Sequence, residues 1–327
     1  MLWDNQSVPT VSVVIPAYRV TPYIAEALDS IFHQTFSDYE VIVVNDGCPD
    51  TEALESVLRP YLSRIRYLKR ERNSGVAAAR NAGIEAALSP YIAFLDGDDF
   101  WDARYLEIHV AMLREDPALD VVYGNARIFG SSTDAGRLAM DLLPSRGEVT
   151  FASLISMRCN VCVSSTVRRE MLLRVGMFDV KQQLCEDFDL WLRIAKAGGK
   201  FAYHQQVVLH YRKRDGSQSS NARVSLLAMI DLSERFQRSG QLTPAECELA
   251  QRQVDQWRAE LDLTEGRGAF EAGRFDEAIA HLEEAQRYFN TRKLALVLFA
   301  LRTVPGVVLQ VYRLRHRFLL ARAASVH

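Results

Sequence analysis

The first hundred residues alternate short apolar runs with segments whose apolar positions recur at helical spacing. Short apolar runs favour strands, and recurrence every three or four residues favours helices. The predicted strands cover 11–16, 40–46, 65–70 and 91–99, and the predicted helices cover 21–35, 51–63 and 74–88. In the first helix, an apolar face is formed by Ile24, Leu28, Ile31 and Phe32, and Thr21 with Pro22 is typical of a helix start. This rhythm predicts an α/β fold with a mostly parallel sheet flanked by helices.

The same pattern continues to about residue 212 and then changes. Further strands are predicted at 121–129, 160–169 and 201–212, with a helix at 186–198 before the last of them. Residues 213–222 form a polar stretch, and the chain is wholly helical in pattern from 223 onward. We therefore predict a first domain over 1–222, a helical region over 223–292, and a basic, apolar helical tail over 293–327.

Composition narrows the class of protein. The chain has 327 residues, of which 48% are apolar and 24% charged, with a formal net charge of −2. These values are ordinary for a globular protein and exclude a collagen, a disordered chain and a disulfide-rich mini-protein. The near-neutral net charge also excludes binding of nucleic acid through the overall charge of the protein. The charge is uneven, because residues 286–327 carry 8 Lys and Arg and no Asp or Glu. A basic, apolar tail on an acidic body points to a membrane surface or an acidic partner.

The cysteines and the N-terminus suggest a cytoplasmic body. Five cysteines are an odd number and sparse for this length, so a reducing compartment is the simpler interpretation. Cys159 and Cys162 form a C-x-x-C pair, but no second pair or His cluster completes a zinc site, so two small strand residues are expected. The first residues lack the charged and long apolar regions of a signal peptide.

Chemistry-bearing residues follow three of the predicted core strands. The first ends in Pro16-Ala17-Tyr18, the second in Asn45-Asp46-Gly47, and the third in Asp96-Gly97-Asp98-Asp99. Ligands bind beyond the carboxyl ends of parallel strands, so these residues should meet at one edge. Carboxylates there suit an anion held with a metal ion. A dinucleotide site is excluded, since no G-x-G-x-x-G follows the first strand.

Four segments carry the candidate chemistry, and each has a structural alternative. The carboxylates of 95–101 suit Mg²⁺ or Mn²⁺, or form a solvated turn. Glu186, Asp187 and Asp189 open a helix, where they supply a general base or only complement the helix dipole. In segment 71–83, Arg72 and Arg80 either bind phosphate or orient carboxylates, or they are surface residues of a packed Ala-rich helix. The basic loop 210–220 closes over a diphosphate or is a linker.

Taken together, these motifs resemble the family 2 glycosyltransferases of the GT-A fold. The resemblance rests on VSVVIPAYR, EVIVVNDGCPDT, NSGVAAARNAGIEAA, YIAFLDGDDFW, GMFD, EDFDLWLRIA and HYR, which occur in that order between about residues 10 and 220. It implies an inverting enzyme that uses a nucleotide-sugar donor and Mg²⁺ or Mn²⁺. Two segments depart from the pattern of many relatives. Arg19 follows the tyrosine where they have Asn, and Asn45-Asp46-Gly47-Cys48 stands where they have DDGS.

The resemblance also assigns roles to individual residues. It implies a metal ligand at Asp98 and the catalytic base at Asp187, with Glu186 and Trp191 in the acceptor region. The donor-binding residues that it implies are Pro16, Ala17, Tyr18, Asp46, Arg72, Gly75, Arg80, Asn81, Asp96 and Arg212. One displacement that inverts the anomeric carbon needs only one base, whereas a retaining hydrolase needs two closely placed carboxylates.

The C-terminal third offers two candidate surfaces. Residues 265–290 resemble one tetratricopeptide-type helix pair, which packs on the first domain or docks a protein through 263–290. In the tail, Leu294 to Leu301 is apolar all round and should be buried. The run is too interrupted for a membrane span. An interfacial helix over 293–323 that meets anionic headgroups competes with an intramolecular or dimer-forming helix.

The leading functional hypothesis is a glycosyltransferase of cell-surface polysaccharide or lipopolysaccharide synthesis, with a lipid-linked or glycan acceptor, at the inner face of the cell membrane. The alternative from another class is a scaffold that binds a nucleotide-sugar and docks partners through its helical tail. A sugar nucleotidyltransferase fits less well, because PAYRVTPY lacks a Gly- and Arg-rich phosphate loop.

Overall fold

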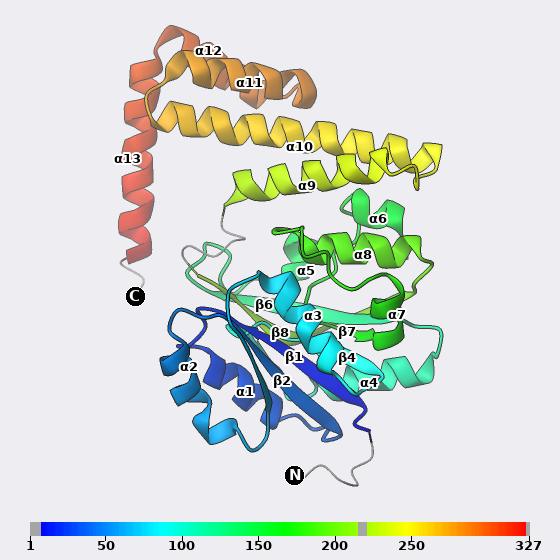
Figure 1. Ribbon diagram of the computed structural model, residues 1–327. Coiled ribbons are helices and arrows are strands. Elements are labelled where there is room, and N and C mark those ends of the chain that lie inside the picture. Colours follow the sequence, from blue (N-terminus) through cyan, green and yellow to red (C-terminus); the bar gives the residue numbers. More distant parts are fainter. Residues whose placement is uncertain (1–7, 215–220, 325–327) are drawn as a thin grey trace. The chain divides into compact units, whose positions relative to one another are not determined.

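A computed structural model of the chain describes residues 8–214 and 221–324, and side-chain surroundings as far as residue 314. The chain divides into two compact units, Met1–Ser220 and Asn221–His327 (Figure 1). The division lies two residues before the boundary that the sequence pattern predicts. The first unit holds an eight-stranded sheet, and in the second the described residues form helices.

The sheet of the first unit is mixed and mostly parallel, so the predicted fold class is confirmed. Its strand order is β3-β2-β1-β4-β7-β6-β8-β5. Pairing is parallel from β3 through β2 and β1 to β4 and again between β6 and β8, and antiparallel at β7 and β5. The strands are β1 (Val11–Ala17), β2 (Tyr39–Asp46), β3 (Arg66–Arg70), β4 (Tyr91–Phe94), β5 (Phe100–Trp101), β6 (Val121–Gly130), β7 (Ser165–Arg168) and β8 (Phe201–Lys213).

Helices cover both faces of this sheet. They are α1 (Ile24–Phe32), α2 (Thr51–Leu58) with the short η1 (Arg59–Tyr61), α3 (Val76–Ala86), α4 (Tyr105–Glu115), α5 (Ala139–Leu142), α6 (Phe151–Ile155), α7 (Arg169–Arg174) and α8 (Glu186–Lys196). Val11, Val13 and Ile15 of β1 share one buried cluster with α1 and α4. Val14 points to the other face, where a β-carbon on Gly83 of α3 would lie 2.3 Å from its Cγ1. The glycine therefore lets α3 pack directly on the central strand.

Three local predictions for this unit need correction. α1 begins at Ile24 rather than near Thr21, because the Thr21 hydroxyl donates a hydrogen bond to Asp50 instead of capping the helix. The third core strand ends at Phe94, since the acidic residues after it leave the sheet in a turn. β7 begins only at Ser165, so Cys159 and Cys162 lie in a loop and are not strand residues.

The second unit is built from α9 (Ala222–Arg238), α10 (Pro244–Glu271), α11 (Phe275–Phe289), α12 (Arg292–Thr303) and α13 (Pro305–Ala324). The segment 265–290 comprises the end of the long α10, the turn after it and α11. A β-carbon on Gly266 would lie 2.9 Å from Leu282 Cγ, so these two helices pack closely. Leu298 and Leu301 of α12 and Leu309 of α13 belong to the same core. The start of the predicted tail is thus part of the helical unit.

Candidate active site

The acidic turn Asp96–Asp99 follows β4, at the carboxyl edge of the parallel strands. A β-carbon on Gly97 would lie 2.9 Å from Val20 Cγ2 and 3.3 Å from the carbonyl oxygen of Pro16. The glycine is therefore required by a close approach, which brings the turn against the end of β1. The side chains of Asp96 and Asp98 keep 27% and 16% of their surface exposed. Both carboxylates are thus within reach of a ligand at this edge.

Arg80 of α3 joins the acidic turn to the start of α8. Its guanidinium is 2% exposed and makes two ion pairs, from Nη2 to Asp96 Oδ1 and from Nη1 to Glu186 Oε1, each 2.7 Å long. Next to it, the Asn81 amide donates to the carbonyl of Phe178 at 2.8 Å and accepts from the Phe178 N–H at 2.9 Å. Arg80 and Asn81 therefore assemble segments that lie far apart in the sequence.

Asp187 lies in the first turn of α8, beside Glu186. Burial and the neighbouring Glu186 carboxylate raise the pKa of Asp187 to about 7, while the charge of Arg80 opposes this rise. Its carboxylate accepts a hydrogen bond of 2.8 Å from the N–H of Phe188, which holds the side chain in place. A carboxylate with a pKa near neutrality is suited to general base catalysis. The charge of Asp96 also acts on Asp187, so the turn and the helix start form one electrostatic site.

The far side of the acidic turn is held by the end of β8. The N–H of Arg212 donates to Asp99 Oδ1, and its Nε donates to the carbonyl of Asp98, both at 2.7 Å. The guanidinium of Arg212 also pairs with Glu26. Arg214 Nη2 lies 2.7 Å from Asp98 Oδ2. Arg212 therefore braces the turn, and Arg214 supplies the positive charge that faces Asp98.

Asp98 could bind a divalent cation only as one of several ligands, the others being supplied by the substrate. Burial and the nearby Asp96 charge raise the pKa of Asp98, and the charge of Arg214 opposes this rise. Among the side chains that the structure describes, within 8–214 and 221–314, however, no three His, Cys, Asp or Glu form a group that could hold a metal ion. Mg²⁺ and Mn²⁺ commonly take one or two carboxylates plus substrate phosphates. The residues thus fit a cation that is bound together with a diphosphate.

Asp46, at the end of β2, organises the loop before α3. Its carboxylate accepts from the N–H groups of Ser74 and Gly75, at 3.1 and 2.9 Å, and pairs with Arg70 at 3.0 Å. The loop also crosses Gly47 closely, because a β-carbon there would lie 2.4 Å from the Arg72 carbonyl carbon. Asp46 is therefore buried beneath a loop that its own carboxylate holds in position.

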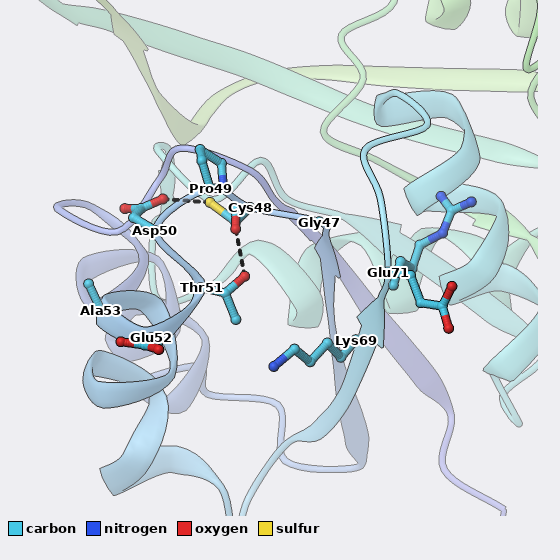
Figure 2. Close-up of a pocket in the computed structure, with 10 residues that line it drawn as sticks. Gly47, Cys48, Pro49, Asp50, Thr51, Glu52, Ala53, Lys69 and Glu71 are labelled. Carbon is cyan, nitrogen blue, oxygen red and sulfur yellow. Dashed lines mark hydrogen bonds between the residues drawn. The ribbon is translucent and has the colours of Figure 1, made fainter.

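An open pocket of about 770 Å³ adjoins this end of β2. It is lined by residues 47–53 and 69–71. Figure 2 shows Cys48, Pro49 and Thr51 on one side of the pocket and Lys69 on the other. The Cys48 thiol lies 2.7 Å from Asp50 Oδ1, and the Thr51 hydroxyl donates to the Cys48 carbonyl. Polar groups from two neighbouring strand ends thus surround a space next to Asp46.

The remaining predicted residues are placed as follows. Pro16 and Ala17 are buried at the end of β1, Tyr18 is partly exposed, and Arg72 is exposed in the loop before α3. Trp191 does not face an acceptor, because it is 1% exposed and packs against Phe201. This corrects its assignment to the acceptor region. Of loop 210–220, residues 215–220 lie outside the described part of the chain.

Two features of the site escaped the sequence analysis. The ion pair of Arg214 with Asp98 and that of Arg70 with Asp46 involve basic residues to which no role was assigned. The basic character of 210–220 was the only signal for Arg214.

Burial raises the pKa of the thiols of Cys162 and Cys185 to about 12, so neither is a ready nucleophile.

Sequence comparison identifies relatives over this unit. Residues 12–176 match the family described as glycosyl transferase family 2. The chain is 30% identical to the Escherichia coli UDP-Glc:alpha-D-GlcNAc-diphosphoundecaprenol beta-1,3-glucosyltransferase WfgD, over 64% of this chain and 80% of that protein. It is 27% identical to the putative teichuronic acid biosynthesis glycosyltransferase TuaG of Bacillus subtilis, over 65% of this chain and 82% of that protein.

Solved structures share the fold. The chain is similar to Staphylococcus aureus TarS 1-349 in complex with UDP-GlcNAc, with a TM-score of 0.57 and 18% identity, over 93% of this chain and 91% of that one. It is also similar to the mannosyltransferase PcManGT from Pyrobaculum calidifontis in complex with GDP-Man and Mn²⁺. That match has a TM-score of 0.60 and 18% identity, over 95% of this chain and 87% of that one.

Proposed function

Because this chain belongs to glycosyl transferase family 2 and is a glycosyltransferase, we propose that it transfers a sugar from a nucleotide-diphosphate donor to an acceptor hydroxyl with inversion. One observation carries this proposal. Buried Arg80 forms ion pairs with both Asp96 and Glu186, and thereby brings the acidic turn next to Asp187. The names of the relatives WfgD and TuaG support a role in cell-surface glycan synthesis. We also propose a lipid-linked acceptor, which the name of WfgD supports, and action at the inner face of the cell membrane.

The donor would lie along the carboxyl ends of β1, β2 and β4. Pro16 to Tyr18 and the loop 72–75 flank this edge, and the pocket beside Asp46 offers room for a nucleoside. Asp46 and Gly75 act here mainly by holding the loop, since the carboxylate accepts the loop's own N–H groups. Arg80, Asn81 and Arg212 likewise act as positioning residues, because each is engaged with protein partners.

Asp187 would accept the proton of the acceptor hydroxyl as its oxygen attacks the anomeric carbon. Only the ionised form can do this, so the neighbouring Arg80 charge keeps the base usable at neutral pH. Attack from the face opposite the diphosphate inverts the stereocentre in one displacement. Glu186 would contribute by holding Arg80 rather than by reacting, since its carboxylate is already ion-paired.

Asp98 would hold Mg²⁺ or Mn²⁺ together with donor phosphate oxygens. A divalent cation at this position supplies charge neutralisation for the leaving diphosphate. The Mn²⁺ in the structural neighbour PcManGT supports this assignment. Arg214 would compete with the cation for Asp98, because its guanidinium lies 2.7 Å from the Oδ2 atom.

The test is a comparison of donor binding and turnover. UDP-, GDP-, dTDP- and CMP-sugars are added to the protein with Mn²⁺ or with EDTA, and thermal unfolding is followed. A donor at about 100 times its Kd should stabilise the fold by about 2.7 kcal/mol. We expect one nucleotide class to do so, with the effect lost in EDTA and in Asp98→Ala.

A matched pair of variants tests the base. Asp187→Asn should keep the donor-induced stabilisation and lose turnover, while Asp141→Asn, an exposed carboxylate of α5, should leave both unchanged. Turnover that survives in Asp187→Asn would reject the assigned base. Donor binding without turnover in the unmodified protein, over a panel of acceptors, would favour the scaffold hypothesis.

A further inference from the structure

Helices α12 and α13 expose an unusual number of large apolar side chains. Leu296 and Phe299 of α12 are 69% and 67% exposed. Val307, Val311 and Leu314 of α13 are 57%, 59% and 66% exposed. Large exposed apolar patches on a folded protein commonly mark an interaction surface. We call this set of five residues the apolar ridge.

The apolar ridge lies opposite the faces by which the two helices join their own core. Leu298, Leu301 and Leu309 pack inward against α10 and α11. In α13 the exposed positions 307, 311 and 314 follow the i, i+4, i+7 spacing of one helix face. Each helix is therefore apolar on both sides, whereas a helix on a water-facing surface normally carries polar residues outward. The described chain thus provides no cover for this face of 294–301, which the sequence predicts to be buried.

The charge of the segment indicates what covers the ridge. Residues 286–327 contain 8 Lys and Arg and no Asp or Glu. Arg292 and Lys293 are exposed at the first turn of α12, one helical turn from Leu296. In the described chain no single helix is long and apolar enough to cross a membrane, but α12 and residues 305–314, bent by 117°, meet the length and hydropathy criterion together.

We propose that α12 and α13 form a membrane-binding surface, with the apolar ridge inserted among the lipids and the basic residues against anionic headgroups. Insertion removes the exposed apolar side chains from water, and the basic residues are attracted to the negative surface of the bilayer. A bent pair of short helices can lie in the plane of the interface along its whole length. The proposal concerns this surface alone and does not depend on which sugar the enzyme transfers.

A second copy of the chain is the competing occupant, and the charge argues against it. Arg287 and Arg302 pair with Glu284 and Glu283, but two identical segments would still bring together the other 6 Lys and Arg of 286–327 from each chain, with no acidic residue in the segment. Like charges at an interface oppose association. An anionic lipid surface has the opposite sign, so it is favoured by the same residues that disfavour self-association.

The experiment measures flotation of the full chain with lipid vesicles. The vesicles are phosphatidylcholine alone or phosphatidylcholine with roughly 30% phosphatidylglycerol, an anionic lipid that imitates a charged leaflet. Binding should require the anionic lipid and should weaken between about 0.1 M and about 1 M salt, where the Debye length falls from ~10 to ~3 Å. Because no donor is added, failure of this test leaves the proposed transferase activity untouched.

Two double variants separate the apolar from the charged contribution. Leu296→Gln with Phe299→Gln keeps the charge and should weaken vesicle binding by about ten-fold or more. Arg292→Gln with Lys293→Gln should weaken binding to anionic vesicles by about 30-fold. The matched control is Leu62→Gln with Leu88→Gln, two exposed apolar residues of the first unit, which should bind as the unmodified protein does.

The outcomes that overturn the proposal are distinct. Equal binding of the Leu296 and Phe299 double variant and the unmodified chain would show that the ridge is not the contact. No binding to either vesicle, together with a dimer in sedimentation that dissociates in this variant, would assign the ridge to a second copy. Unfolding curves of all variants are recorded as the control for an intact fold, and we expect the exposed substitutions to leave them unchanged.

Discussion

Replacing Glu186 by Gln should lower the pH at which the enzyme becomes active. Burial raises the pKa of Asp187 most, and the charge of Glu186 raises it further, with a smaller contribution from Asp96. The charge of Arg80 lowers it. The substitution removes the charge of Glu186 and frees one nitrogen of Arg80 from its ion pair. Both effects favour the ionised form of Asp187, so both move its pKa downward from about 7.

The expected size follows from the charge that is removed. A unit charge roughly 7 Å away at an effective dielectric constant of about 20 contributes about 2 kcal/mol. One pKa unit corresponds to about 1.4 kcal/mol, so we expect a decrease of about one unit once solvent relaxation is allowed for. With a pKa of about 7, roughly a tenth of Asp187 is ionised at about pH 6, and with a pKa of about 6, half is ionised. The activity at pH 6, relative to its plateau, should then rise about five-fold.

The assay is kcat/KM measured between about pH 5 and pH 9 by the release of nucleoside diphosphate. A base must be ionised to act, so activity rises with pH through the pKa of the free enzyme. The matched control is Asp189→Asn in the same helix turn. Asp189 pairs with Arg193 at 2.6 Å, and its removal should destabilise the protein without moving the pH midpoint. A lower plateau activity in Glu186→Gln would not contradict the prediction, because Arg80 also loses an ion-pair partner in this variant.

The refuting result is an unchanged or higher midpoint in Glu186→Gln. An unchanged midpoint would mean that the rising limb reports a group other than Asp187. A higher midpoint would mean that Glu186 stabilises the ionised base, for example through a different position of Arg80. A midpoint that also moves in the Asp189→Asn control would indicate a general loss of structure.

Three further predictions concern other parts of the chain. Gly83→Ala should lower the free energy of unfolding by about 1–3 kcal/mol, because its β-carbon would meet a β1 valine at 2.3 Å. The control Gly268→Ala, whose β-carbon meets nothing within 4 Å, should instead raise the free energy of unfolding by up to about 1 kcal/mol. Equal effects of the two substitutions in denaturant unfolding would contradict the packing argument. Arg214→Gln should bind Mn²⁺ about five-fold more tightly in the absence of donor, because the guanidinium no longer competes for Asp98, and an unchanged Kd in a Mn²⁺ titration would count against that competition. Thr243→Ala should destabilise the helical unit by about 1 kcal/mol through loss of the capping box, whereas Thr243→Ser should not, as calorimetry of the two variants would establish.

The elements that carry the chemistry could be predicted because their signals are local. The turn after β4 combines an apolar run with Asp and Gly, and the start of α8 combines acidic residues with an apolar face. Both signals lie within about ten consecutive residues. By contrast, α4 was not among the predicted elements, although its buried Tyr105, His109 and Leu113 recur every four residues.

Pairings across the fold could not be predicted, because they depend on the order of the strands. Nothing near Arg80 in the sequence indicates that its partner is Glu186, 106 residues further on. The burial of Trp191 could not be predicted for the same reason. A helical pattern shows which residues share a face of the helix, but not which other element covers that face. The exposure of Leu296 and Phe299 is the opposite case, where an apolar pattern predicted a cover that the described chain does not provide.

The Arg80 bridge has a consequence for the order in which the protein matures. A growing chain that has already delivered β1 to β4 contains Arg80 and Asp96 but not yet Glu186. A buried guanidinium that lacks one of its carboxylates costs several kcal/mol, about 3–5 in comparable cases. During synthesis, α3 therefore gains little by closing over the arginine until α8 emerges. The catalytic centre is then completed late, and a nascent chain that stops before residue 186 should hold donor poorly even where strands β1 to β4 have already paired.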